Sequence, residues 1–109
     1  PTASDSTLII FCNIQLAFGG NSEAGGAALF VDSTANAIAG VGGCFVTTIH
    51  EGVHIAFIHS VSAASTSART YKLRYGSGGG VTVTANGRGG GRKFGGILSS
   101  GIVIMEVGA

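Results

Sequence analysis

Apolar residues recur at every second position along the first long segment of the chain, from Thr7 to Phe18. A period of two residues is typical of a β-strand, because successive side chains of a strand point to opposite faces of a sheet. The segment is therefore predicted to be a strand with one face in the protein core. The residues of this face are Leu8, Ile10, Cys12, Ile14, Leu16 and Phe18.

The opposite face of the same strand is apolar as well, since it carries Ile9 and Phe11. The C-terminal segment GIVIMEV shows the same feature, because apolar residues occupy both of its alternating sides. A two-layer β domain has one interior, so a second apolar face indicates contact with another subunit. The alternative is a central strand that a loop covers. The residues predicted to form the subunit interface are Ile9, Phe11, Val103, Met105 and Val107.

Further short apolar runs are separated by glycine-rich breaks such as GGNSEAGG and GSGGG, and no segment of ten or more residues has a helical period. With 109 residues, 20 of them glycine, the chain is predicted to be one all-β domain, residues 1–109, built as an antiparallel sandwich or jelly roll. No apolar stretch reaches the length of a membrane helix, so no membrane insertion is expected. About eight strands are expected, near residues 6–18, 27–32, 36–40, 44–49, 53–61, 69–76, 80–85 and 101–107.

The letters H-E-x-x-H at residues 50–54 match the zinc-protease motif, which needs a helix to bring both histidines onto one face. Gly52 interrupts the motif, and the residues from Val53 onward alternate as in a strand. The third ligand of the longer protease motif is missing, because Ser60 stands where a histidine is required. We therefore expect no metal site and no metal cofactor here.

The two cysteines, Cys12 and Cys44, lack C-x-x-C spacing, and Cys12 lies on the core face of its strand. They are predicted to be buried free thiols, with a disulfide as the alternative. No nucleophile elbow, phosphate loop or dinucleotide motif can be placed. The sequence therefore predicts no enzyme, no catalytic residue and no cofactor.

Charge is scarce and sorted along the chain. Only 10% of the residues are charged; residues 1–68 carry a net −4 and residues 69–109 a net +5. A local basic field attracts phosphate or carboxylate groups, so these cations are the candidate ligand-binding residues. The alternatives are pairing with the acidic half of another subunit, or solubility alone. A net charge of +1 argues against nucleic acid as a partner. The candidates are Arg69, Lys72, Arg74, Arg88, Arg92 and Lys93.

The second half of the chain resembles the C-terminal knob domains of bacteriophage tail fibres, tail needles and head fibres. The strand Thr70–Tyr71–Lys72–Leu73 matches their T-Y-x-L strand, and a glycine turn and a Val/Thr strand follow it. The last strand, from Ile102 to Val107, matches the closing strand that ends in M-E-(I/V). The glycine-rich, arginine-rich loop at residues 87–96 departs from this pattern.

The resemblance implies a jelly-roll knob, similar to the tumour-necrosis-factor-like fold, that forms a homotrimer at the tip of a virion fibre assembled in the host cytoplasm. It also implies attachment to a host receptor, for which we expect a cell-surface polysaccharide or lipopolysaccharide. The start at Pro1 fits the expectation of a C-terminal fragment of a longer fibre protein. The alternatives are a capsid decoration or cap protein without a receptor, and a free-standing lectin-like carbohydrate-binding module.

Overall fold

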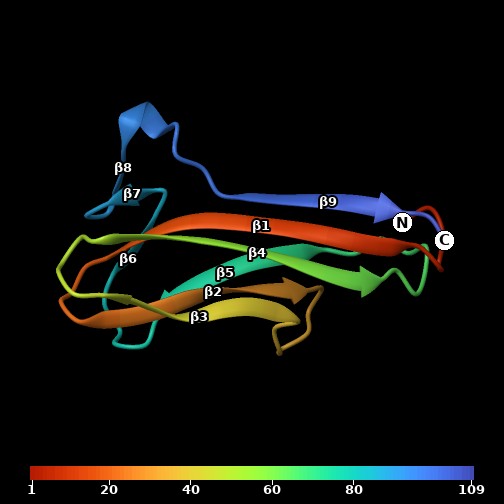
Figure 1. Cartoon of the computed structure of the whole chain (residues 1–109), viewed down its shortest axis with the longest axis horizontal. Helices are drawn as coiled ribbons and strands as arrows, with labels where there is room; N and C mark the ends of the chain where they lie inside the picture. Colours follow the sequence, from red (N-terminus) through yellow and green to blue (C-terminus); the bar gives the residue numbers. More distant parts are fainter.

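The computed structural model describes all 109 residues and shows an all-β protein with antiparallel sheets (Figure 1). The molecule is elongated, with extents of 47 × 30 × 19 Å. Its only helical element is η1, a short 3-10 turn at Phe94–Gly96, and no helix is long and apolar enough to cross a membrane. The strands are β1 (Thr7–Phe18), β2 (Glu23–Val31), β3 (Ala39–Val46), β4 (Gly52–Ser62), β5 (Tyr71–Ser77), β6 (Val83–Ala85), β7 (Gly87–Arg88), β8 (Gly91–Arg92) and β9 (Gly101–Val107).

Two sheets form the layers of the molecule, and β7 pairs with β8 in a separate small hairpin. The first layer, which we call sheet A, has β1 at its centre. β4 pairs with one edge of β1 along nearly all of its length, while β9 pairs with residues 7–13 and β6 with residues 16–18 on the other edge. The second layer, sheet B, has β2 between β3 and β5.

The chain crosses between the sheets at the left end of the molecule in Figure 1. There β1 leads into β2 and β3 leads into β4, so that β4 returns beside β1. β1 and β4 therefore pair in sheet A, while β2 and β3 pair in sheet B. β5 then extends sheet B, and β6 and β9 bring the chain back to sheet A.

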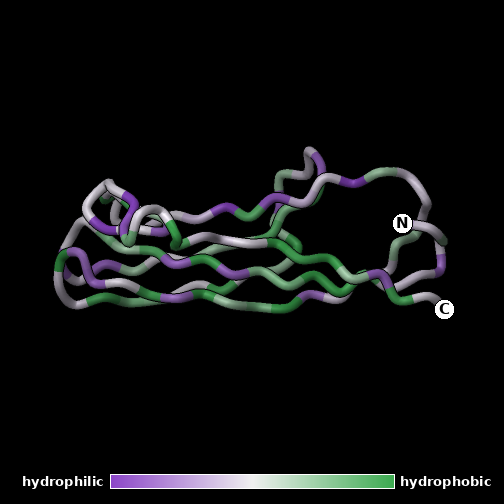
Figure 2. The backbone as a smooth tube through the Cα atoms, turned by 90° about the horizontal axis from the view of Figure 1, so that it is seen from above, coloured by the Kyte–Doolittle hydropathy of each residue, from purple (hydrophilic) through white to green (hydrophobic).

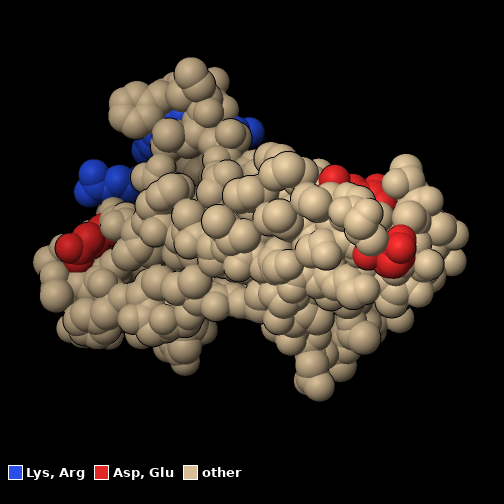
Figure 3. Space-filling model, turned by 45° about the vertical axis from the view of Figure 1, so that its right-hand side comes forward, with Lys and Arg blue, Asp and Glu red and all other residues tan.

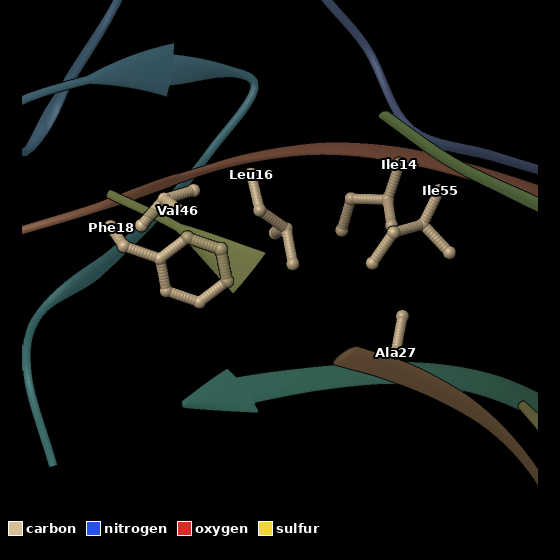
Figure 4. Close-up of a cluster of buried hydrophobic side chains, with 6 residues drawn as sticks. All are labelled: Ile14, Leu16, Phe18, Ala27, Val46 and Ile55. Carbon is tan, nitrogen blue, oxygen red and sulfur yellow. The ribbon is translucent and has the colours of Figure 1, made fainter. Parts of the chain in front are cut away.

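The alternating pattern of β1 builds the core, and Figure 2 shows hydrophobic and hydrophilic positions alternating along the strands. Ile10, Leu16 and Phe18 are fully buried, and Figure 4 shows Leu16 and Phe18 pointing from β1 into the interior, with Ala27 of β2 below Ile14 and Ile55. Leu29 on β2 closes the core near the other end. Burial of a side chain of this size stabilises the fold by about 1.5–3 kcal/mol.

Two segments differ from the prediction. Residues 36–49, expected as two strands, contain the single strand β3, because a bulge shifts its register against β2 without ending the pairing. Gly43 lies in this irregular part with a positive φ of 71°, a conformation that glycine adopts without steric cost. The loop at residues 87–96, where no strand is expected, contains the β7–β8 hairpin and η1.

Both cysteines are free, as predicted. Cys12 is buried in the core, and this burial raises the pKa of its thiol. Cys44 is only half-buried, because it lies on β3 at the edge of sheet B. The two residues lie in different sheets. Because Cys12 is free and buried, it acts as a small apolar side chain of the core.

Glu106 on β9 ties the N-terminal segment to sheet A. Its carboxylate accepts hydrogen bonds from the Thr2 amide at 2.7 Å and the Thr2 hydroxyl at 2.9 Å, and from the Ala3 amide at 3.3 Å. The pKa of Glu106 is lowered to about 2, first by the nearby Ser6 hydroxyl and then by the Thr2 and Ala3 donors. The Ser6 hydroxyl is buried and forms no hydrogen bond of good geometry, so the Thr2 and Ala3 bonds carry this contact.

The lowered pKa predicts an acid-sensitive contact. Because the folded-state pKa of about 2 lies below the ordinary value of 4.5, the contribution of Glu106 to stability is complete above pH 4.5 and is lost as the pH falls toward 2. We expect Glu106→Gln to lower the Tm at pH 7 and to reduce the fall in Tm between pH 4.5 and 2. Asp5→Asn is the control, because Asp5 also lies near the N-terminus. Equal Tm changes with pH in wild type and Glu106→Gln would contradict the prediction.

Candidate functional site

One outer surface of the sandwich is apolar. The pairing register of sheet A places Met105 of β9 opposite Ile9 of β1, and Phe11 of β1 between Ile58 of β4 and Val103 of β9. These side chains point away from sheet B, because Leu8, Ile10 and Cys12, which alternate with Ile9 and Phe11 on β1, are buried. Residues paired across neighbouring strands lie on the same side of the sheet. We call this surface the apolar face; it consists of Ile9, Phe11, Ile58, Val103, Met105 and Val107.

The apolar face is open to solvent in the single chain. Ile58 and Val103 keep 64% and 61% of their surface exposed, and only 14 of 109 residues are buried in the whole molecule. The accessible surface is 6084 Å², whereas a compact monomer of this mass has about 5,500 Å². All five interface residues predicted from the sequence lie on this surface. The single chain therefore exposes apolar area that a partner subunit can cover.

Three of the six candidate cations, Arg69, Lys72 and Arg74, lie on or beside β5 of sheet B. Arg69 forms an ion pair with Asp32 at 3.1 Å, and Lys72 donates a hydrogen bond to the Asp32 carbonyl. The Thr70 amide and the Arg69 guanidinium lower the pKa of the Asp32 carboxyl. Arg74 stacks over the Phe30 ring at 4.9 Å on the outer face of sheet B. These cations therefore already have partners within the chain.

The other three candidate cations lie in the projecting loop, residues 86–100, which rises beyond sheet A at the upper left of Figure 1. Figure 3 shows Lys and Arg side chains beside this projection, while most of the visible surface is uncharged. Arg88 and Lys93 are exposed and form no ion pair. Arg92 instead donates hydrogen bonds to the Gly96 and Leu98 carbonyls at 2.6 and 2.5 Å. The six candidate cations therefore fall into two groups, and Arg92 shapes the loop.

A cleft of about 370 Å³ separates the projecting loop from the adjoining end of β1 and β4. Two cations, one aromatic ring and two polar side chains meet there, although they come from segments far apart in the sequence. We call this site the loop cleft. Its main side chains are Gln15, His50, Arg88, Lys93, Phe94 and Leu98.

The H-E-x-x-H residues lie on a turn and a strand, as their alternation predicts. His50 precedes β4, while His54 lies on β4 and is exposed. The Glu51 carboxylate accepts hydrogen bonds from the Thr48 amide at 3.1 Å and the Thr47 amide at 2.7 Å, which lower the pKa of Glu51. No group of three metal-ligating side chains occurs anywhere in the structure. Glu51 thus stabilises the turn between β3 and β4.

An open groove of about 550 Å³ lies on the outer side of sheet B, where Figure 3 shows the lower surface hollowed between two projections. Its lining includes small residues such as Gly26, Ala28 and Gly40, together with Arg74 and Phe30. This surface is separated from the loop cleft by both layers of the sandwich. Arg74 therefore lies on the opposite side of the sandwich from the cations of the projecting loop.

Comparisons with protein-family models, curated proteins and solved structures find no match to this chain. The functional interpretation therefore depends on the apolar face and the loop cleft. Sequence reasoning missed Ile58 as a member of the apolar face, although the alternation after Val53 places it on the solvent side of β4. It also missed Gln15, His50 and Phe94 as neighbours of Arg88, because no sequence signal joins these distant positions.

Proposed function

We propose that this chain is the knob domain of a virion fibre or needle, in which three copies join through their apolar faces and attach the particle to a host surface. The observation that supports the proposal most is the apolar face, because monomeric proteins rarely leave so continuous an apolar sheet surface in water. Three copies that turn this face toward a common axis remove it from solvent. The two antiparallel sheets are compatible with a jelly-roll knob.

The oligomeric state tests the proposal directly. Light scattering at micromolar concentration is expected to give three times the chain mass of 10.8 kDa. A stable monomer would contradict the trimer and remove its main argument. An array of bacterial lipopolysaccharides and capsular polysaccharides then separates an attachment knob from a capsid decoration or cap, which would bind none of them.

Attachment is expected to depend on the two unpaired cations of the projecting loop. We predict that replacing Arg88 and Lys93 together by Ser weakens adsorption of the trimer to host cells and flattens its dependence on salt, because exposed charges more than about 8 Å apart are screened at physiological ionic strength. Three linked weak sites raise apparent affinity by roughly 10²–10⁴, so the loss is amplified in the trimer. Arg92 is kept, since its hydrogen bonds hold the loop together.

The control for this experiment is Arg69 and Lys72 replaced together by Ser, which removes the same charge from the Asp32 end of sheet B. Adsorption is measured across a salt series for all three proteins. Equal losses in both double variants would show that net charge, and not the projecting loop, governs adsorption. Unchanged adsorption of the Arg88 and Lys93 variant would place recognition elsewhere on the molecule.

A further inference from the structure

Two cations of the loop cleft form no ion pair with an acidic group of the chain. Arg88 of β7 and Lys93 beside η1 both line it, and neither forms an ion pair. The nearest acidic residue in the sequence to His50 is Glu51, whose carboxylate is already bound to the Thr47 and Thr48 amides. Two exposed cations at one cleft favour a ligand that carries a carboxylate or a phosphate.

Two bulky residues of the cleft have an unfavourable backbone conformation. His50 has a φ of 66° and Phe94 a φ of 52°, in the left-handed region that costs about 1–2 kcal/mol for a residue with a side chain. The Phe94 side chain is also 81% exposed, which makes it the most exposed large apolar residue of the chain. Conformations of this kind cluster at ligand clamps. The strained backbone of Phe94 and its exposed ring therefore both point to ligand binding.

The projecting loop, which carries Phe94, is held in place before any ligand binds. Arg92 bridges the Gly96 and Leu98 carbonyls, and the Gly90 amide donates a hydrogen bond to the Thr84 hydroxyl at 2.8 Å. The Asn86 amide donates to the Gln15 carbonyl at 2.8 Å and so joins the loop to β1. A site that is already ordered loses little conformational entropy on binding.

We infer that the loop cleft binds an anionic saccharide, that is, a sugar ring that carries a carboxylate or a phosphate. Arg88 and Lys93 bind the acidic group, and the ring packs its C–H face against Phe94, as an exposed aromatic side chain allows. The Gln15 amide supplies a donor and an acceptor for sugar hydroxyls. The inference rests on the proposed function, because it assigns a ligand class to the surface by which the knob attaches.

The ligand class can be tested by calorimetry on the wild-type protein with four probes. Tetragalacturonate and a phosphorylated mannose tetrasaccharide carry sugar rings with carboxylates and with phosphate. Maltotetraose has the rings without charge, and tripolyphosphate has the charge without rings. We expect one or both of the anionic saccharides to bind. Maltotetraose and tripolyphosphate should bind at least about tenfold more weakly, because the first lacks the acidic group and the second lacks the sugar ring. Tripolyphosphate binding as tightly as the saccharides would overturn the sugar class.

Variants then locate the site. Arg88→Ser and Phe94→Ala should each weaken saccharide binding by about tenfold, while Arg74→Ser, which removes the same charge from sheet B, should leave it unchanged. Gly87→Ala should also abolish binding, since a Cβ at Gly87 would lie 2.0 Å from the Gly91 carbonyl oxygen and break the hairpin. Its control is Gly91→Ala, where the nearest atom to the new Cβ, the Arg88 carbonyl oxygen, is 4.0 Å away. Equal losses in Arg88→Ser and Arg74→Ser would contradict the cleft.

Light scattering on the same samples keeps the two proposals apart. A trimer that binds no anionic saccharide would overturn the cleft inference and leave the assembly intact. A monomer that binds the saccharide in an Arg88-dependent way would support the cleft and contradict the trimer.

Discussion

Replacement of Val103 by Asp is expected to convert the trimer into monomers. Val103 lies beside Phe11 near the middle of the apolar face and is 61% exposed in the single chain. If three copies cover this face, the new carboxylate enters a dry contact without a partner, which costs on the order of 3–5 kcal/mol per chain. Light scattering and size-exclusion chromatography measure the loss of the trimer, and circular dichroism shows whether the strands persist.

Phe45→Asp is the matched control for this variant. Phe45 is 58% exposed, close to the value of Val103, but it lies on β3 of sheet B, away from the apolar face. We expect the Phe45→Asp protein to remain a trimer. If Val103→Asp stays folded and trimeric, the subunits join through another surface, and if both variants dissociate, the loss is not specific to the apolar face.

Replacement of Gly25 by Ala is expected to destabilise the chain strongly. A Cβ at this position of β2 would lie 2.3 Å from the Gly76 carbonyl oxygen and 2.6 Å from the Phe18 ring. Phe18 is fully buried and the Gly76 carbonyl belongs to the neighbouring strand, so both sheets must shift. Overpacking of this kind costs about 1–3 kcal/mol, which corresponds to a fall in Tm of roughly 5–20 °C for a domain of this size.

Gly76→Ala provides the control, because a Cβ at Gly76 would meet no atom within 4 Å. Gly25 lies on β2 and Gly76 on β5, which pair with each other in sheet B, so both variants change a glycine of the same sheet. Thermal unfolding followed by circular dichroism is expected to show a large loss for Gly25→Ala and little change for Gly76→Ala. Similar losses in both variants would mean that glycine content, and not the close approach at Gly25, decides the stability.

The long strands could be predicted because their periodicity is local. The alternation from Thr7 to Phe18 gives both the strand and the buried face of β1, and the segments from Val53 and from Ile102 give β4 and β9 in the same way. β3 was predicted as two strands, because a bulge interrupts the period of two while the hydrogen bonding to β2 continues. A bulge is defined by the partner strand, which a single segment of sequence does not contain.

The candidate surfaces could be predicted only in part. The residues of the apolar face were visible as strands with two apolar sides, and the structure adds Ile58 because register places it opposite Phe11. The basic residues were correctly seen as concentrated in one half of the chain, but Arg69 and Lys72 turned out to bind Asp32. An ion pair across almost forty positions depends on how β2 and β5 pair, which charge counting does not show.

The sequence by itself determined the all-β class, the core face of β1 and the existence of a second apolar face, because side-chain direction along a strand follows from local backbone geometry. The tertiary structure alone decided which apolar residues meet on sheet A, since the register between β1, β4 and β9 sets their neighbours. It also decided that Arg88, Lys93 and Phe94 share a cleft with Gln15 and His50. The crossings between sheets bring these segments together, and such crossings depend on packing of the whole chain rather than on any single segment.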